Sequence, residues 1–135
     1  MTALTADRNT AQRSADNRNF PVKAATTIFA GAMAAVDATG MLVPAGATAA
    51  LKVVGRNERQ VVNAGADGSV RADVKTGVFR FANSASTDAI TLADIGSNCY
   101  AVDDQTVAKT SNSSARPVAG TIFDVDDQGV WVKFS

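Results

Sequence analysis

Asp124, Asp126, Asp127 and Gly129 follow the spacing with which a calcium-binding loop begins. Such a loop also needs a bidentate Glu at its twelfth position to complete the oxygen ligands of the ion. The twelfth position falls on Ser135, which cannot bind in that way. The segment therefore predicts a hairpin turn, and we expect no metal site in this chain.

Asp103 and Asp104 form a second group of carboxylates, which general acid–base catalysis could use. Adjacent residues in a turn direct their side chains apart, whereas glycoside hydrolysis needs two carboxyls about 5 to 9.5 Å apart across a cleft. The sequence contains no His, so Ser–His and Cys–His nucleophile pairs cannot form. An enzyme that uses Asp103 or Asp124 stays open as an alternative, but we expect no catalytic residue and no enzymatic activity.

Cys99 is the single thiol of the chain and lies beside Tyr100 in an apolar run. This setting is typical of a buried structural Cys and not of a reactive one. Zinc requires about four ligands, most of them Cys or His, which this sequence cannot supply. We expect neither an internal disulfide nor a bound cofactor.

The elements that would position any site begin with an extended arm, expected at residues 1–19. Cations recur at five-residue intervals through the arm and just beyond it: Arg8, Arg13, Arg18 and Lys23. Five residues match neither the helical period of about 3.6 nor the strand period of two, so these cations line no single face. Between Leu4 and Phe20 there is almost no large apolar side chain. A disordered tail is the alternative, since domain termini are poorly ordered unless something holds them.

The length of 135 residues allows one domain with a single core, which we place at 20–135. Aromatic residues make up only 6%, so the core should be thin. The formal net charge is zero: residues 1–23 carry +2 and the rest carries −2. A nucleic-acid-binding protein would be more basic. No signal peptide and no run of roughly 20 apolar residues is seen, so we expect no membrane partner and a cytosolic chain.

From Phe20 onward, short apolar runs alternate with turn residues, which predicts an all-β domain, either a small barrel or a sandwich. The segment 70–74 alternates apolar and charged residues, so one of its faces should be buried. Thr91 and Asp94 are placed to cap one short helical turn near 91–95. No repeat of 20 to 50 residues and no linker is apparent in the sequence.

Short glycine- and valine-containing motifs follow one another along nearly the whole chain. They are LTADRNT at 4–10, FPV at 20–22, GAM at 31–33 leading to Asp37, VVGR at 53–56, GVFRF at 77–81, IG at 95–96 before YAVD at 100–103, and AGT at 119–121 ahead of Val132. In this order they resemble the capsid cement, or head decoration, proteins of tailed bacteriophages.

The resemblance implies a β-rich structural protein of the virion. Such a protein, assembled in the host cytoplasm, binds the outer surface of the expanded head and reinforces joints between major capsid protein subunits. It implies no catalytic residue and no cofactor. The residues that would bind the capsid are Leu4, Thr5, Arg8, Arg13, Arg18 and Phe20. A homo-oligomer is expected, either a trimer or a dimer, because several arms then engage together.

The physics of the arm agrees with that role. Twenty extended residues reach roughly 60 to 70 Å. Ordering them costs on the order of 20 to 40 kcal/mol, and offsetting the lower figure by burial alone needs roughly 800 Å² of apolar area. Leu4, Phe20 and a few alanines hardly supply this area. We therefore expect the arm to be disordered in the free protein and to order on its partner through strand hydrogen bonds and Arg contacts with acidic groups.

Two other structural roles stay open. A phage tail or baseplate β-domain would share this composition and the lack of an active site. A carbohydrate-binding module would need exposed aromatic rings on one face. Trp131 and Tyr100 both lie in apolar runs, which disfavours such a module.

Overall fold

Twelve β-strands and two short 3-10 turns make up the computed structural model, which describes residues 2–135. The strands are β1 (Asn17–Pro21), β2 (Thr26–Ile28), β3 (Met33–Val36), β4 (Leu42–Pro44), β5 (Lys52–Asn57), β6 (Val61–Asn63), β7 (Arg71–Lys75), β8 (Gly77–Phe81), β9 (Asn98–Ala101), β10 (Val107–Ala108), β11 (Val118–Asp126) and β12 (Gly129–Phe134). The turns are η1 (Ser86–Asp88) and η2 (Leu92–Asp94). The all-β prediction is confirmed.

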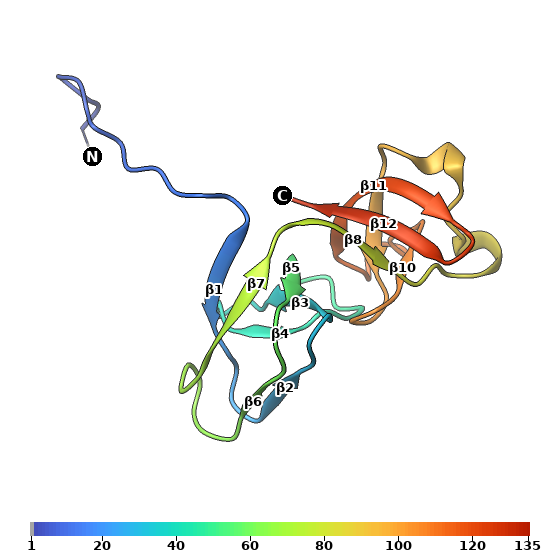
Figure 1. Ribbon diagram of the computed structural model, residues 1–135, viewed down its shortest axis with the longest axis horizontal. Coiled ribbons are helices and arrows are strands. Elements are labelled where there is room, and N and C mark those ends of the chain that lie inside the picture. Colours follow the sequence, from blue (N-terminus) through green and yellow to red (C-terminus); the bar gives the residue numbers. More distant parts are fainter. Residues whose placement is uncertain (1) are drawn as a thin grey trace.

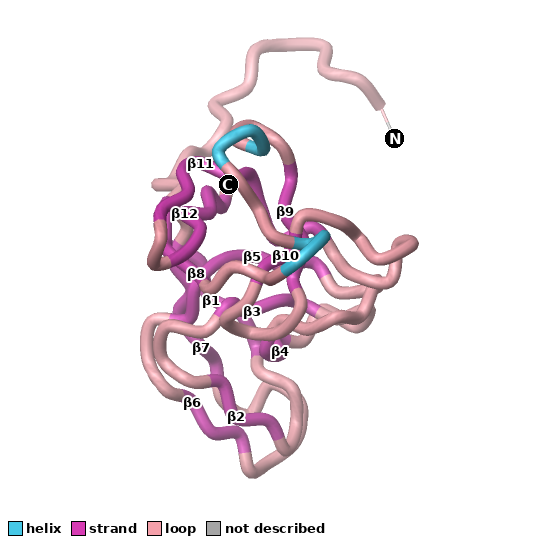
Figure 2. The backbone as a smooth tube through the Cα atoms, turned by 90° about the vertical axis from the view of Figure 1, so that its right-hand side faces the viewer, coloured by secondary structure: helices cyan, strands magenta, loops and turns pink. Residues whose placement is uncertain are grey.

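The strands form two five-stranded antiparallel sheets and one two-stranded ribbon (Figures 1 and 2). The first sheet has the order β1-β7-β5-β3-β4, the second β10-β9-β11-β12-β8, and the ribbon pairs β2 with β6. One parallel bridge pairs Val22, which follows β1, with Leu42 in β4. Another pairs Ala82, which follows β8, with Thr106, which precedes β10. Both sheets are therefore strongly curled, but neither is a closed barrel.

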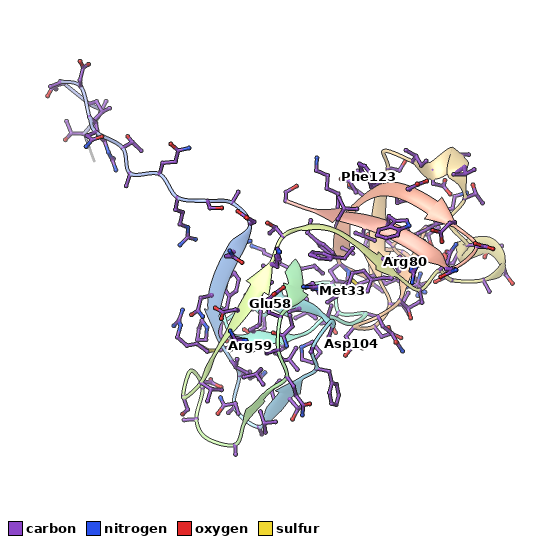
Figure 3. All side chains as sticks on the ribbon, in the orientation of Figure 1. Met33, Glu58, Arg59, Arg80, Asp104 and Phe123 are labelled. Carbon is purple, nitrogen blue, oxygen red and sulfur yellow. The ribbon has the colours of Figure 1, made fainter. Side chains whose placement is uncertain are left out.

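Strand β3 is buried on both faces. Met33 and Ala35 pack into the core of the second sheet, and Met33 lies between the two sheets in Figure 3. Ala34 and Val36 belong to the other core, which lies between the first sheet and the β2–β6 ribbon. The expectation of a single core is therefore wrong, because this one strand serves two cores. This double burial explains why β3 is a continuous apolar run and does not alternate with polar residues.

The two sheets repeat one topology. In chain order, the strands of the first unit are β1, β3, β4, β5 and β7, and those of the second are β8 to β12. In both units they lie side by side as first, fifth, fourth, second and third. The sequence shows no repeat because the two units share their backbone pairing and not their side chains. Each unit, 17–75 and 77–134, is also longer than the roughly 20 to 50 residues of common sequence repeats.

Two glycines occupy equivalent places in the repeated unit. Gly55 in β5 pairs with Ala34 beside a β-bulge, and Gly120 in β11 pairs with Cys99 beside another. A Cβ atom on Gly55 would lie 2.5 Å from the carbonyl oxygen of Lys75, and one on Gly120 would lie 2.5 Å from that of Lys133. Both sheets thus depend on a close backbone approach that only glycine permits.

Buried asparagines hold the β2–β6 ribbon to the first sheet. Asn63 is 1% exposed, and its Nδ2 donates to the carbonyl oxygens of Val22, Lys23 and Ala66 at 3.0, 3.2 and 2.9 Å. Asn57 is fully buried, and its Nδ2 donates to the carbonyl oxygens of Ile28 and Phe29, where the chain leaves β2, and of Arg59. The amide groups replace the regular ladder hydrogen bonds that these loops lack, so the ribbon has a fixed place.

The helical turn predicted near 91–95 is present as η2. The backbone N–H of Thr91 donates to Oδ2 of Asp94 at 2.8 Å, which lowers the pKa of this carboxyl. The turn η1 is an addition that the sequence did not predict. It is held by Asp88, whose carboxylate accepts hydrogen bonds from Thr110 and Arg116.

Replacing either glycine by alanine should destabilise the fold. We expect Gly55→Ala and Gly120→Ala each to lower the free energy of unfolding by about 1–3 kcal/mol, because the added methyl group overpacks a strand interface. Gly55 also has a φ of +148°, which L-residues rarely adopt. Urea unfolding measures the change. Gly46→Ala is the control, since nothing lies within 4 Å of that Cβ position; equal stability of all three variants would contradict the packing.

Acid should weaken the β3–β4 turn. Oδ1 of Asp37 accepts hydrogen bonds from the Thr39 hydroxyl at 2.7 Å and the Met41 N–H at 3.1 Å. The Thr39 hydroxyl above all lowers the pKa of Asp37 from 3.8 to about 2. A carboxyl with a lowered pKa stabilises the fold fully above its unfolded pKa and loses that contribution as the pH falls toward the folded pKa.

The test compares urea unfolding of the wild type and Asp37→Asn between pH 6 and pH 2. The wild type should lose its advantage over the variant as the pH falls from about 4 to about 2. A difference in stability that stays constant over this range would show that Asp37 does not titrate as its contacts require.

Candidate functional site

The arm is the most exposed feature of the molecule. Residues 2–16 form no strand, and each of them is exposed. Figure 1 shows this segment running away from both sheets. Leu4 is 72% exposed, so its apolar side chain has no cover within the protein. An extended segment with free backbone groups can pair with a strand edge of another protein.

Thr76 holds the base of the arm. Its N–H donates to the carbonyl oxygen of Asp16 at 3.0 Å, and its hydroxyl donates to that of Ala15 at 2.6 Å. Thr76 is 8% exposed and is the single residue between β7 and β8, where the chain passes from the first sheet to the second. The arm therefore leaves the body at the junction of the two sheets, in a fixed place.

The arm predicted from the sequence, residues 1–19, ends three residues later than the arm in the structure. Strand β1 begins at Asn17 and pairs with β7, so residues 17–19 belong to the sheet and the arm ends at Asp16. The sequence does not reveal this strand because its side chains are mostly polar. Asn19 Nδ2 donates a hydrogen bond to Asp73 Oδ1 at 2.9 Å, across the β1–β7 pair. Backbone pairing and cross-strand polar contacts stabilise β1 where large apolar residues are few.

The six residues predicted to bind a capsid fall into two groups. Leu4, Thr5, Arg8 and Arg13 lie in the exposed arm. Arg18 and Phe20 lie in β1 instead, with the Arg18 guanidinium 4.8 Å from the Phe20 ring centroid. Phe20 is half-buried against the core of the first sheet. The structure therefore leaves the first four free for a partner, while the last two already have contacts within the domain.

The acidic segment at 124–129 forms the predicted hairpin turn. The Asp126 carboxylate accepts hydrogen bonds from the N–H groups of Gln128 and Gly129 and from Nε1 of Trp131 at 2.8, 3.1 and 2.9 Å. The Trp131 contact above all lowers the pKa of Asp126. In residues 2–135 no three His, Cys, Asp or Glu side chains gather as metal ligands. The carboxylate thus stabilises the turn that joins β11 to β12.

Asp103 also has a structural contact, because its Oδ1 accepts a hydrogen bond from the Gln105 N–H at 2.9 Å. An open depression of about 480 Å³ lies where the two sheets meet, lined by Val53, Tyr100, Arg116 and Val118 among others. Neither Asp103 nor Asp124 lines it. The structure therefore does not bring these carboxylates together around that depression.

The sequence reasoning missed a set of exposed apolar side chains. These are Phe29, Val62, Leu92, Ile95 and Phe123, which are between 47% and 65% exposed. One signal was available: in β11, Ile122 and Phe123 are adjacent, and successive residues of a strand face opposite ways, so one of them must face outward.

Comparisons with protein-family models, with curated proteins and with solved structures found no match for this chain. In residues 2–135, none of the helical segments is long and apolar enough to cross a membrane.

Cys99 should be unreactive in the folded protein. It is fully buried, its Sγ donates to the carbonyl oxygen of Gly120, and burial raises the pKa of its thiol to about 11. We expect a thiol reagent at pH 8 to modify it at least roughly a hundredfold more slowly than in urea, because reaction requires opening of the core. Rapid stoichiometric modification without urea would contradict this burial. Cys99→Ala gives the background rate.

Proposed function

We propose that this protein is a structural component of a phage virion that binds the outer surface of the head and stabilises contacts between neighbouring major capsid protein subunits. The observation that carries the proposal is the exposed arm of residues 2–16, anchored at Thr76. The resemblance of its ordered motifs to capsid cement proteins supports the same role.

The arm has no source of stability within its own chain. Ordering about 15 residues costs on the order of 15 to 30 kcal/mol of backbone free energy, and no residue from 2 to 16 is buried to offset it. A partner surface supplies what is missing: strand hydrogen bonds for the backbone and apolar cover for Leu4. The arm therefore gains its order from the protein to which it binds.

Arg8 and Arg13 supply the charged contacts of this arm. Each guanidinium can form two parallel hydrogen bonds with a carboxylate, which is stronger and more specific than a single contact. In an extended chain residues five apart lie about 17 Å apart, and an odd spacing places them on opposite faces. The arm is therefore suited to lie in a groove between two acidic surfaces, as at a joint between subunits.

The number of sites on a shell compensates for weak single contacts. A homo-oligomer, as a trimer or a dimer, presents several arms at once, and engagement of one arm raises the local concentration of the others. Because Thr76 fixes the exit point of the arm, each arm starts from a defined place on its own body. Such an assembly reinforces a shell from its outer surface without entering it.

Co-sedimentation with undecorated, expanded phage heads tests the proposal. The full chain should bind, and a chain lacking residues 2–14 should bind at least tenfold more weakly while its thermal unfolding stays unchanged. This deletion preserves the contacts of Ala15 and Asp16 with Thr76. Arg8→Lys with Arg13→Lys is the matched control, because it keeps the charge and loses the paired hydrogen bonds; its binding should be intermediate.

Trypsin gives a second measurement on the same samples. Cleavage after Arg8 and Arg13 should be fast in the free protein and slow on the heads, because the bound arm is ordered. Equal binding of the full and shortened chains, or equal cleavage in both states, would exclude the arm as the binding element.

A further inference from the structure

Exposed apolar side chains gather at two places on the folded body. Among residues 2–135, those of large size outside the arm are Phe29 (59% exposed), Val62 (57%), Leu92 (65%), Ile95 (47%), Val118 (45%) and Phe123 (58%). Phe29 and Val62 belong to the β2–β6 ribbon and its continuation, and we call them the ribbon patch. Leu92, Ile95 and Phe123 belong to η2 and the adjoining part of β11, and we call them the turn patch.

The ribbon patch is a fixed surface. Thr27 pairs with Val62 and the buried Ile28 pairs with Val61, so the alternation along β2 carries Phe29 to the same side as Thr27 and Val62. The carbonyl oxygens of residues 28 and 29 both accept hydrogen bonds from the buried Asn57 amide. Its two apolar side chains are thus displayed on an ordered backbone.

The turn patch is held as firmly. The N–H of Gly96 donates to the carbonyl oxygen of Ile122 at 2.9 Å, and the N–H of Ile122 donates to that of Ser97 at 2.9 Å. The segment after η2 therefore lies along β11. Phe123 is the extra residue of a β-bulge between Ile122 and Asp124, and such a bulge redirects a side chain. Figure 3 shows Phe123 on the outer side of β11.

Each patch includes residues from the same connection of the repeated unit. Strand β2 lies between the first two strands of its unit, β1 and β3, and η2 lies between the first two strands of the other, β8 and β9. Val62 lies in β6, on the connection from β5 to β7, whereas Phe123 lies within β11 itself, between Ile122 and Asp124, which both pair with β12. The two units thus each display apolar side chains at the connection between their first two strands.

The patches lie at opposite ends of the body. In Figures 1 and 2 the β2–β6 ribbon forms one end of the body, and β11 with its neighbouring turn lies at the other end. The body therefore carries one apolar patch at each end.

We infer that the ribbon patch and the turn patch are two like docking sites, each of which binds one subunit of the same coat protein. The inference rests on the proposed function. A shell presents identical surfaces at fixed spacing, and a body with an apolar patch at each end suits two neighbouring copies of such a surface. In this arrangement the two ends bridge adjacent subunits while the arm provides a separate attachment.

The size of the patches favours a shell over a second copy of this chain. A fully buried aromatic side chain covers about 150–250 Å², and each patch has one Phe with one or two aliphatic side chains, all only partly exposed, so each patch offers at most roughly 200–300 Å². Even with an equal area on the partner, this is below the roughly 1,200 Å² that a stable pair of proteins buries. Contacts of this size persist when several are engaged together, and a shell holds both subunits in place.

The test uses two patch variants of the full chain and one control. Phe29→Ser with Val62→Ser removes the ribbon patch, and Leu92→Ser with Phe123→Ser removes the turn patch. Val118→Ser is the control, because it is exposed to a similar degree but lies outside both patches. The single changes Phe29→Gln and Phe123→Gln serve if a double variant loses its thermal unfolding transition.

Each patch variant should bind expanded heads at least tenfold more weakly than the wild type and the control. The sharper measurement is made at saturating concentrations, where every variant coats the heads through its arm. Wild type and control should then raise the temperature at which the heads release their contents. The patch variants should not, because a molecule attached at one end reinforces no joint.

Each outcome has one meaning. If the patch variants bind and stabilise heads as the wild type does, the two docking sites do not exist, and the proposed attachment through the arm still stands. If the wild type itself fails to bind heads, the proposed function is wrong and the inference fails with it. If the patch changes instead dissociate an oligomer of the free protein in analytical ultracentrifugation, the patches bind another copy of this chain and the inference is overturned.

Discussion

The burial of β3 on both faces is the constraint on which the rest of the structure depends. Met33 and Ala35 close the core of the second sheet, while Ala34 and Val36 close the core of the first. Because one strand serves both cores, the two sheets cannot separate without exposing apolar surface on each. Two of the four residues of β3 are alanines, which let layers pack closely on both sides of a single backbone.

The shared strand makes one body from two units with the same topology. Where the units agree, they do so in backbone features: the strand order, a bulge opposite Ala34 or Cys99, and a glycine that allows close approach. Where they differ, the difference lies in the connections. The first unit carries a ribbon fastened by asparagine amides, and the second carries turns fastened by aspartates. The two units therefore differ in their connections, while the order of strands in their sheets is the same.

The roles proposed for the arm and the two patches rest on one physical principle, which is that weak contacts become effective when a rigid body fixes their spacing. Thr76 connects these features, because it lies between the two sheets and holds the base of the arm. The exit of the arm and the separation of the patches are therefore set by the same stacked core. A partner with a regular lattice of identical subunits can use all of them together.

Local sequence was enough for the all-β character, the hairpin at Asp126, the turn capped by Asp94 and the burial of Cys99. Each of these follows from a few neighbouring residues: turn residues between apolar runs, a carboxylate placed to accept nearby N–H groups, or a thiol within an apolar strand. Only the tertiary structure decided where the arm ends, that the unit is repeated, and which apolar residues face outward. Strand β1 is polar and is stabilised by β7, more than fifty residues away in the chain. The repeat resides in pairing between distant strands, and the exposure of Phe29 and Phe123 depends on which face each core has already used. The alternation of side chains along a strand follows from the local sequence. Which of the two faces is buried depends on packing against residues far away in the sequence.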